Sequence, residues 1–225
     1  MRVAVVGTGV SGLVAAHLLN SQAELTLFEA RERIGGHVAT VEVEGPDGST
    51  LAIDTGFIVY NEHNYPLFTR LLGGLGVETQ PSNMSFSVRC DRTGLEYNGS
   101  TIRQLFSRRR NLLDPGFYRM IRDIRRFNRE AVGALEAGAD QATLGEYVSA
   151  AGYSTRLAEH YLVPMGSALW SIPRRQVLEM PAAFFVRFFE HHGMLTVDDR
   201  PEWRVVRGGS QRYVDALIRP FRGRI

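Results

Sequence analysis

The sequence predicts an α/β fold in which a Rossmann-like βαβ domain is interrupted by an inserted, mainly helical domain. Three observations predict this fold. Gly7, Gly9 and Gly12 form a G-x-G-x-x-G turn between two apolar runs, almost at the first residue of the chain. A second short apolar run ends in Glu29. From about residue 81 to about residue 200, strand-like patterns give way to helical periodicity.

The first element is expected to be a strand over Val3–Val6, because this run is short, apolar and rich in β-branched residues. Such a run predicts a strand buried on both faces. A helix is expected to follow over residues 11–20. Gly7 permits the turn, Gly9 lets the backbone approach a pyrophosphate, and Gly12 lets the helix pack close to the strand. The N–H groups at the start of that helix favour phosphate binding.

The run Leu25–Phe28 predicts a second strand, and Glu29 follows it directly. An acidic residue about 20 positions after the glycines accepts hydrogen bonds from the two hydroxyls of a ribose. The same carboxylate repels a 2′-phosphate. The pattern therefore favours NAD or FAD over an NADP-type ligand.

The segment after Glu29 decides between these cofactors. A hairpin is expected there, with strands at 38–44 and 50–54 around a Gly-Pro-Asp-Gly turn, where an NAD-binding domain continues into a crossover helix. An NAD-binding reductase or epimerase also usually has a Tyr-x-x-x-Lys base. All 26 cationic residues of this chain are arginine, so that base is absent and this alternative is disfavoured.

These segments together resemble the flavin-containing amine oxidase family, which includes monoamine oxidases, protoporphyrinogen oxidases and phytoene desaturases. The chain looks most similar to bacterial NAD/FAD-binding members of the amine-oxidase type. The motifs are the glycine turn, Glu29-Ala30-Arg31, Arg33-x-Gly35-Gly36 and Asp54-x-Gly56. They cover residues 1–66 tightly, and beyond that the likeness rests on layout and on residues 206–210.

The resemblance implies FAD as the cofactor, and it implies a role for each matching position. The family usually has arginine at the position of His37, and a neutral imidazole supplies less positive potential than a guanidinium, so flavin affinity or potential is expected to differ. The implied contacts are Gly7, Gly9, Val10, Ser11 and Gly12 with the pyrophosphate, Glu29, Ala30 and Arg31 with the adenosine ribose, Gly35, Gly36 and His37 beside the phosphates and ribityl chain, and Gly56, Phe57 and Ile58 along the isoalloxazine.

The domain division expected from this layout is an incomplete FAD-binding domain at 1–80 and 201–225, and a substrate domain at 81–200. A further strand is expected to begin near Arg224-Ile225, so the chain is expected to be truncated at its C-terminus. The resemblance implies an FAD-dependent oxidoreductase that takes a hydride from a lipophilic or amine substrate. The alternative is an FAD-binding fragment or interaction protein without turnover. No catalytic residue is identified; Tyr60, His63 and Tyr65 are candidates to face substrate, with a structural role favoured.

The inserted region contains a long amphipathic helix that is expected to begin at Asp114-Pro115, an N-cap followed by proline. Its arginine face is expected either to be solvated or to contact an anionic membrane. Nucleic acid is not expected, because aromatic residues do not interleave with the arginines. A capping box is predicted at Thr143–Glu146, and helix breaks are predicted at Pro164, Pro173 and Pro181. The arginines of this face are Arg119, Arg122, Arg126 and Arg129.

Four phenylalanines between residues 184 and 189 predict either a core or the wall of a lipophilic substrate pocket. No metal is expected at His191-His192, since no carboxylate lies at ligand spacing. The single cysteine, Cys90, excludes an internal disulfide and fits a reducing compartment. No signal-peptide pattern or membrane-spanning run is present in the sequence, and a cytoplasmic location is expected.

Overall fold

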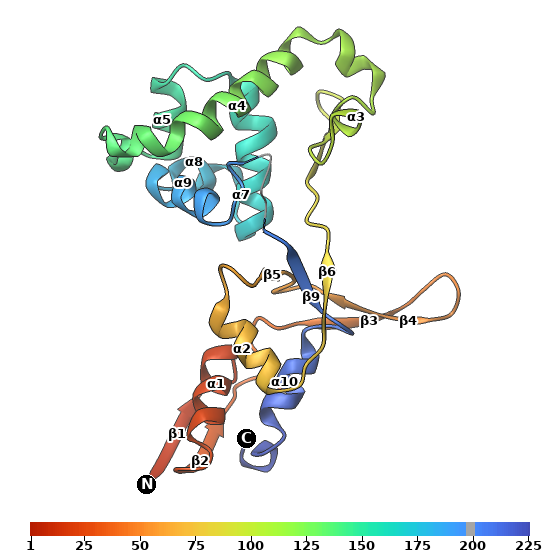
Figure 1. Cartoon of the computed structure of the whole chain (residues 1–225), viewed down its shortest axis with the longest axis vertical. Coiled ribbons are helices and arrows are strands. Elements are labelled where there is room, and N and C mark those ends of the chain that lie inside the picture. The colour runs from red at the N-terminus through yellow and green to blue at the C-terminus, as the bar shows by residue number, and fades with distance from the viewer. Residues whose placement is uncertain (197–200) are drawn as a thin grey trace. The chain divides into compact units, whose positions relative to one another are not determined.

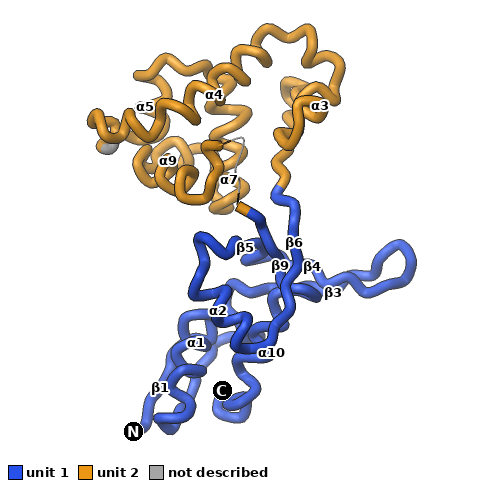
Figure 2. Tube along the Cα trace, in the orientation of Figure 1, with its two compact units in different colours: residues 1–84, 202–225 blue, residues 85–201 orange. Residues whose placement is uncertain are grey.

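The computed structural model describes residues 1–196 and 201–225, and the chain forms two compact units (Figure 2). The first unit comprises residues 1–84 and 202–225, and the second comprises residues 85–201. The division expected from the sequence differs from these bounds by four residues at the first junction and by one at the second. Within the described residues, no helix has both the length and the apolar character needed to cross a bilayer.

The first unit contains short strands and three helices that Figure 1 labels in chain order. The strands are β1 (Arg2–Val6), β2 (Glu24–Phe28), β3 (Thr40–Glu44), β4 (Thr50–Asp54), β5 (Tyr60–Asn61), β6 (Thr79–Ser82) and β9 (Trp203–Val206). The helices are α1 (Val10–Leu19), α2 (Pro66–Gly74) and α10 (Gln211–Ile218), followed by the 3₁₀ turn η4 (Arg222–Arg224).

The β1–α1–β2 unit has the expected parallel pairing, with Val5 opposite Leu27. The prediction that the first strand is buried on both faces is wrong. Leu25 and Leu27 are buried on one face, whereas Val6 and Phe28 are 87% and 55% exposed. The reason is that Leu13 and Ala16 of α1 pack on one face of this sheet, while the other face stays open to solvent among the described residues.

The chain after Glu29 forms turns and then the β3–β4 hairpin, with no helix before β3, as the sequence predicts. The first hairpin strand begins at Thr40, two residues later than expected, because Val38 is buried in the core. Strand β9 lies between β5 and β6 in a three-stranded antiparallel sheet. Residues 222–224, just before the position where a further strand is expected to begin, form the 3₁₀ turn η4.

The second unit is mainly helical, with one antiparallel hairpin near its start (Figure 1). The hairpin strands are β7 (Ser87–Cys90) and β8 (Leu95–Asn98). The helices are α3 (Ile102–Leu105), α4 (Pro115–Glu136), α5 (Leu144–Ala150), α6 (Thr155–Leu157), α7 (Val163–Trp170), α8 (Arg174–Glu179) and α9 (Ala182–His191), with 3₁₀ turns η1 (Arg109–Leu113) and η2 (Ala139–Gln141) and a π-helical segment η3 (Ala158–Leu162).

Local signals position the longest helices. The Asp114 carboxylate accepts hydrogen bonds from the N–H groups of Gly116 and Phe117 at 2.9 and 3.2 Å, so α4 begins as predicted. Thr143 and Glu146 form the predicted capping box of α5. The helix break predicted at Pro164 is wrong: this proline lies in the first turn of α7, which follows the π-helical segment without interruption.

Two of the four phenylalanines in α9 lie in the core of the second unit. Phe185 and Phe189 are fully buried and stack with ring centroids 4.2 Å apart. Phe184 is 51% exposed. The helical spacing of these residues explains the difference, since positions 185 and 189 share one face of α9 and position 184 does not.

Candidate functional site

The glycine turn between β1 and α1 has the tight geometry that the sequence predicts. Gly7 has a φ of +91°, a backbone conformation that residues other than glycine rarely adopt. Its N–H donates to the Phe28 carbonyl at 2.8 Å. A Cβ at position 12 would collide with the carbonyl oxygen of Gly7. The fold itself therefore requires glycine at positions 7 and 12.

Gly9 stands apart from these two residues. It is the N-cap of α1, with φ −66° and ψ 171°, and a Cβ built there meets no atom within 4 Å. No side chain caps this helix end, and its first turn holds no acidic residue. Val10 and Ser11 are exposed beside it. The result is an open space at an uncapped helix N-terminus, an arrangement that favours a bound anion.

Glu29 lies at the end of β2, and its carboxylate is held by the glycine turn. Oε2 accepts from the Thr8 N–H at 2.9 Å and from the Thr8 hydroxyl, and Oε1 accepts from the Arg31 N–H at 3.0 Å. These bonds, that of the Thr8 hydroxyl first, lower the pKa of Glu29 to about 2, so it is ionised at neutral pH. Since a carboxylate offers about four acceptor positions, it keeps about one for a ligand.

Thr8 is the residue of this site that sequence reasoning missed. Thr8 is fully buried and occupies a variable position of the glycine motif. Its hydroxyl is the one feature in the sequence that could have indicated a role for it. Its contact with Glu29 revises the expected geometry. Both carboxylate oxygens accept hydrogen bonds within the protein, Oε2 from Thr8 and Oε1 from Arg31, whereas the carboxylate was expected to serve the two hydroxyls of a ribose.

The segment after β2 returns to the glycine turn. The Gly35 N–H donates to the Thr8 carbonyl at 3.1 Å, and Gly35 pairs with Gly9 in an isolated parallel bridge. A Cβ on Gly36 would lie 2.8 Å from the Gly9 Cα. The two glycine-containing segments are thus in direct backbone contact. Ala30, Arg31 and His37 are exposed around them.

Arg33 fixes this loop from within. Its guanidinium donates to the carbonyl of Gly36 at 2.8 Å and to the carbonyl of Val38. The sequence motif contains this arginine, but the pattern alone assigns it no role. The structure shows that it holds the loop conformation through backbone acceptors.

The residues expected along the isoalloxazine have separate environments. A Cβ on Gly56 would collide with the His37 carbonyl oxygen, so this glycine permits close packing of two chain segments. The Phe57 ring packs edge-on against Tyr65 and Phe68 at 6.0 and 5.7 Å. Ile58 is 48% exposed. Of the three, Ile58 alone presents a largely exposed side chain.

The candidates to face substrate differ in burial. Tyr60 is 2% exposed and packs edge-on against Phe68 at 5.2 Å, which is a core position. Tyr65 is half-buried, and burial raises the pKa of its hydroxyl. His63 is exposed. Nearby, Asn61 is fully buried, and its Nδ2 has no hydrogen-bond partner among the described residues.

A hydrogen-bonded cluster joins the start of α10 to the β3–β4 hairpin. Both Asp54 carboxylate oxygens accept from the Ser210 N–H, at 2.9 and 3.0 Å, and Oδ2 also accepts from the Ser210 hydroxyl at 2.9 Å. The Thr40 hydroxyl donates to Asp54 at 2.5 Å and accepts from the Gln211 N–H at 2.9 Å. The motif residues around positions 54–56 and 206–210 therefore meet at one place.

The second unit holds the features expected of a substrate domain only in part. Phe184 and Phe188 line an open surface pocket of 810 Å³ on α9. His192 stacks on Phe188 with ring centroids 3.9 Å apart, and its ring lies 5.4 Å from that of His191. Among the described residues, no group of three metal-ligating side chains is present.

The arginine face of α4 is partly neutralised. Arg126 and Arg129 both pair with Glu130, at 2.8 and 2.7 Å, and Arg126 also lies 4.5 Å from the centre of the Tyr153 ring. Arg119 and Arg122 are exposed. Arg122 Nε lies 4.0 Å from the Asp123 carboxylate, so three of the four arginines expected on this face pair with an acidic residue.

Comparison with solved structures shows what the fold resembles. The chain is similar to cyclohexylamine oxidase from Brevibacterium oxydans IH-35A, with 20% identity and a TM-score of 0.67, over 99% of this chain and 50% of that one. It is also similar to wild-type putrescine oxidase bound to putrescine, with 20% identity and a TM-score of 0.62, over 97% of this chain and 49% of that one. The chain thus spans about half the length of these structures.

The family comparison extends over nearly the whole sequence. The model of the flavin containing amine oxidoreductases matches residues 10–224. It confirms the resemblance predicted from the motifs and confirms flavin as the cofactor of the family. By this match, the chain belongs to the flavin-containing amine oxidoreductase family.

Proposed function

We propose that the first unit, residues 1–84 and 202–225, is a Rossmann-like FAD-binding domain and that the second unit, residues 85–201, is an inserted substrate domain. The observation that carries this proposal is the uncapped N-terminus of α1 beside the open space at Gly9. There the helix presents N–H groups and positive potential to the pyrophosphate of FAD. Gly35 and Gly36 border the same space.

Glu29 fits the adenosine ribose in this arrangement. Its carboxylate is ionised and oriented by Thr8, and it keeps an acceptor position for a ribose hydroxyl. The exposed Ala30 and Arg31 lie next to it in sequence. His37, exposed near Gly36, takes the position of the family's arginine, which supports a lower positive potential beside the cofactor.

The reaction we propose is the oxidation of a small amine. Flavin supplies the two-electron acceptor for a hydride from the carbon next to the amine nitrogen. The similarity to putrescine oxidase and cyclohexylamine oxidase supports an amine in preference to another lipophilic substrate. The role of the chain's own residues is to bind and orient the cofactor. No lysine is available as a catalytic base in these 225 residues.

The binding proposal is tested by titrating FAD into the wild-type chain and into Glu29→Gln. Loss of the charge-assisted hydrogen bond is expected to weaken FAD binding by roughly 10- to 100-fold. Glu32→Gln is the control, since Glu32 is exposed and makes no hydrogen bond or ion pair with a described residue. Equal affinity of all three proteins for FAD would contradict the assignment of Glu29.

Turnover is tested separately. Bleaching of bound flavin on addition of putrescine or cyclohexylamine supports an enzyme, whereas FAD binding without bleaching supports the alternative of a flavin-binding fragment. The cytoplasmic location and the contact of α4 with anionic membranes stay predictions. Co-sedimentation with anionic against neutral liposomes tests the latter, and the pairing of Arg126 and Arg129 with Glu130 weighs against it.

A further inference from the structure

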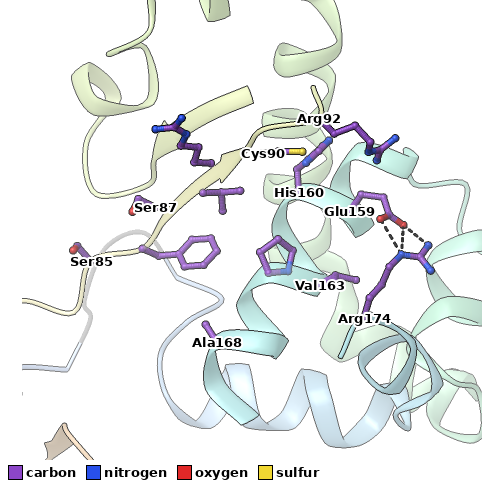
Figure 3. Close-up of a pocket in the computed structure, with 13 residues that line it drawn as sticks. Ser85, Ser87, Cys90, Arg92, Glu159, His160, Val163, Ala168 and Arg174 are labelled. Carbon is purple, nitrogen blue, oxygen red and sulfur yellow. Dashed lines mark hydrogen bonds and ion pairs between the residues drawn. The ribbon is translucent and has the colours of Figure 1, made fainter. Parts of the chain in front are cut away.

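A cavity of 600 Å³ lies within the second unit, between the β7–β8 hairpin and the helical segment from η3 to α7 (Figure 3). Phe86, Val88, Val163 and Pro164 give it an apolar wall. Ser85 and Ser87 lie on one side of it, and Arg89, which pairs with Asp91, also lines it. Four ionisable side chains gather at the other end: Arg92, Glu159, His160 and Arg174.

The helix is irregular where it lines this cavity. Glu159 and His160 belong to the π-helical segment Ala158–Leu162, a local geometry that is frequent at functional sites. Residue 164 is proline and has no N–H, so the His160 carbonyl lacks its α-helical donor. The buried Tyr97 hydroxyl donates to that carbonyl at 2.7 Å instead. A residue from the hairpin thereby stabilises the irregular segment.

The charges at the polar end do not cancel. Glu159 accepts two hydrogen bonds from Arg174 Nε, at 3.0 and 2.9 Å, and forms an ion pair with its guanidinium, so its charge is compensated. Arg92 is exposed and forms no ion pair with any residue that the structure describes, although its charge also acts on Glu159 and His160. Two guanidinium groups therefore face one carboxylate at this end, and the net positive charge attracts an anion and repels an ammonium group.

His160 supports the same conclusion from its hydrogen bonding. It is 7% exposed and lines the cavity, yet its imidazole makes no hydrogen bond to a described residue. Burial, and then the charge of Arg156, lower the pKa of this imidazole, so it is neutral and has one N–H to donate. That N–H is available to an acceptor of a ligand in the cavity.

We propose that this cavity binds a small organic carboxylate with a short apolar tail. The carboxylate accepts hydrogen bonds from Arg92 and His160, and the tail lies along Phe86, Val88 and Val163. None of these residues belongs to the proposed FAD site, and the charge at the polar end excludes an amine as the occupant.

Cys90 reports on occupancy, because it lines the same cavity and is the single cysteine of the chain. We compare its alkylation by uncharged N-ethylmaleimide with hexanoate, hexan-1-ol or hexylamine present. At ten times its dissociation constant, hexanoate is expected to slow alkylation about tenfold, since roughly a tenth of the protein stays free. The alcohol and the amine are expected to give no protection at that concentration.

Arg92→Gln is expected to weaken hexanoate binding about tenfold or more, through loss of a charge-assisted hydrogen bond. Arg119→Gln, an exposed arginine on α4 outside the cavity, is the matched control and is expected to bind as the wild type does. The alkylation rate of each variant with hexanoate is compared with the rate of the same variant without it, because Arg92 also lowers the pKa of the Cys90 thiol. Equal protection by all three compounds, no protection by hexanoate, or full protection of Arg92→Gln would overturn the proposal.

Discussion

Asp54 and Ser210 are 156 positions apart in the chain, yet the carboxylate of Asp54 accepts from both the N–H and the hydroxyl of Ser210. Ser210 in turn donates to the Phe57 carbonyl at 3.1 Å. These hydrogen bonds hold the start of α10 against the end of β4. The contact thereby joins residues 202–225 to residues 1–84 within the first unit.

Asp54→Asn is expected to destabilise the protein by about 1–3 kcal/mol, because an amide replaces a charged acceptor of several hydrogen bonds. Urea unfolding measures this change. Asp47→Asn in the turn of the same hairpin is the control, since Asp47 bonds only to Ser49, two residues away. Equal effects of the two substitutions would show that the contact with Ser210 contributes nothing to stability.

The pKa of Glu29 gives a prediction about pH. Because its folded-state value of about 2 lies below the ordinary 4.5, the bonds from Thr8 stabilise the fold fully above about pH 4.5. That stabilisation is lost as the pH falls through about 2. Thr8→Val removes the hydroxyl donor and is expected to raise the pKa of Glu29, as followed by carboxyl NMR titration. The Thr69 hydroxyl donates to the Tyr65 carbonyl instead, so Thr69→Val is expected to leave the pKa of Glu29 unchanged.

Tyr97 and Pro164 are expected to be energetically coupled through the His160 carbonyl. Tyr97→Phe removes the donor to that buried oxygen and is expected to cost about 1–3 kcal/mol of stability. In a Pro164→Ala background the cost is expected to fall by more than half, because residue 164 regains an N–H. A double-mutant cycle measures this coupling. Strictly additive effects would contradict the role assigned to Tyr97.

The phenylalanines of α9 are expected to respond unequally to truncation. Phe185→Ala leaves a cavity in the core and is expected to cost about 3–5 kcal/mol. Phe184→Ala, at an exposed position, is expected to cost about 1 kcal/mol or less. Thermal unfolding of the two variants measures the difference. Similar losses of stability in the two variants would contradict the assignment of Phe185 to the core and of Phe184 to the surface.

Local signals predicted much of the structure. The glycine turn, the Asp114 cap and the Thr143 capping box each lie within a few residues, so the sequence contains all the information for them. The burial of β1 depends on which elements cover the two faces of its sheet, and no local pattern reveals them. The contacts of Tyr97 with His160 and of Asp54 with Ser210 join distant segments, and only the folded chain brings them together.

The central claim is that the space at Gly9 holds the pyrophosphate of FAD, and FAD titration of Gly9→Ala tests it most directly. A Cβ at position 9 meets no protein atom within 4 Å, so this variant is expected to unfold at the wild-type temperature. Overpacking against the cofactor is expected to weaken FAD binding about tenfold or more. Gly133→Ala, a position in α4 with equally open surroundings, is the control. Wild-type affinity of Gly9→Ala for FAD, or no FAD binding by the wild-type chain, would contradict the claim.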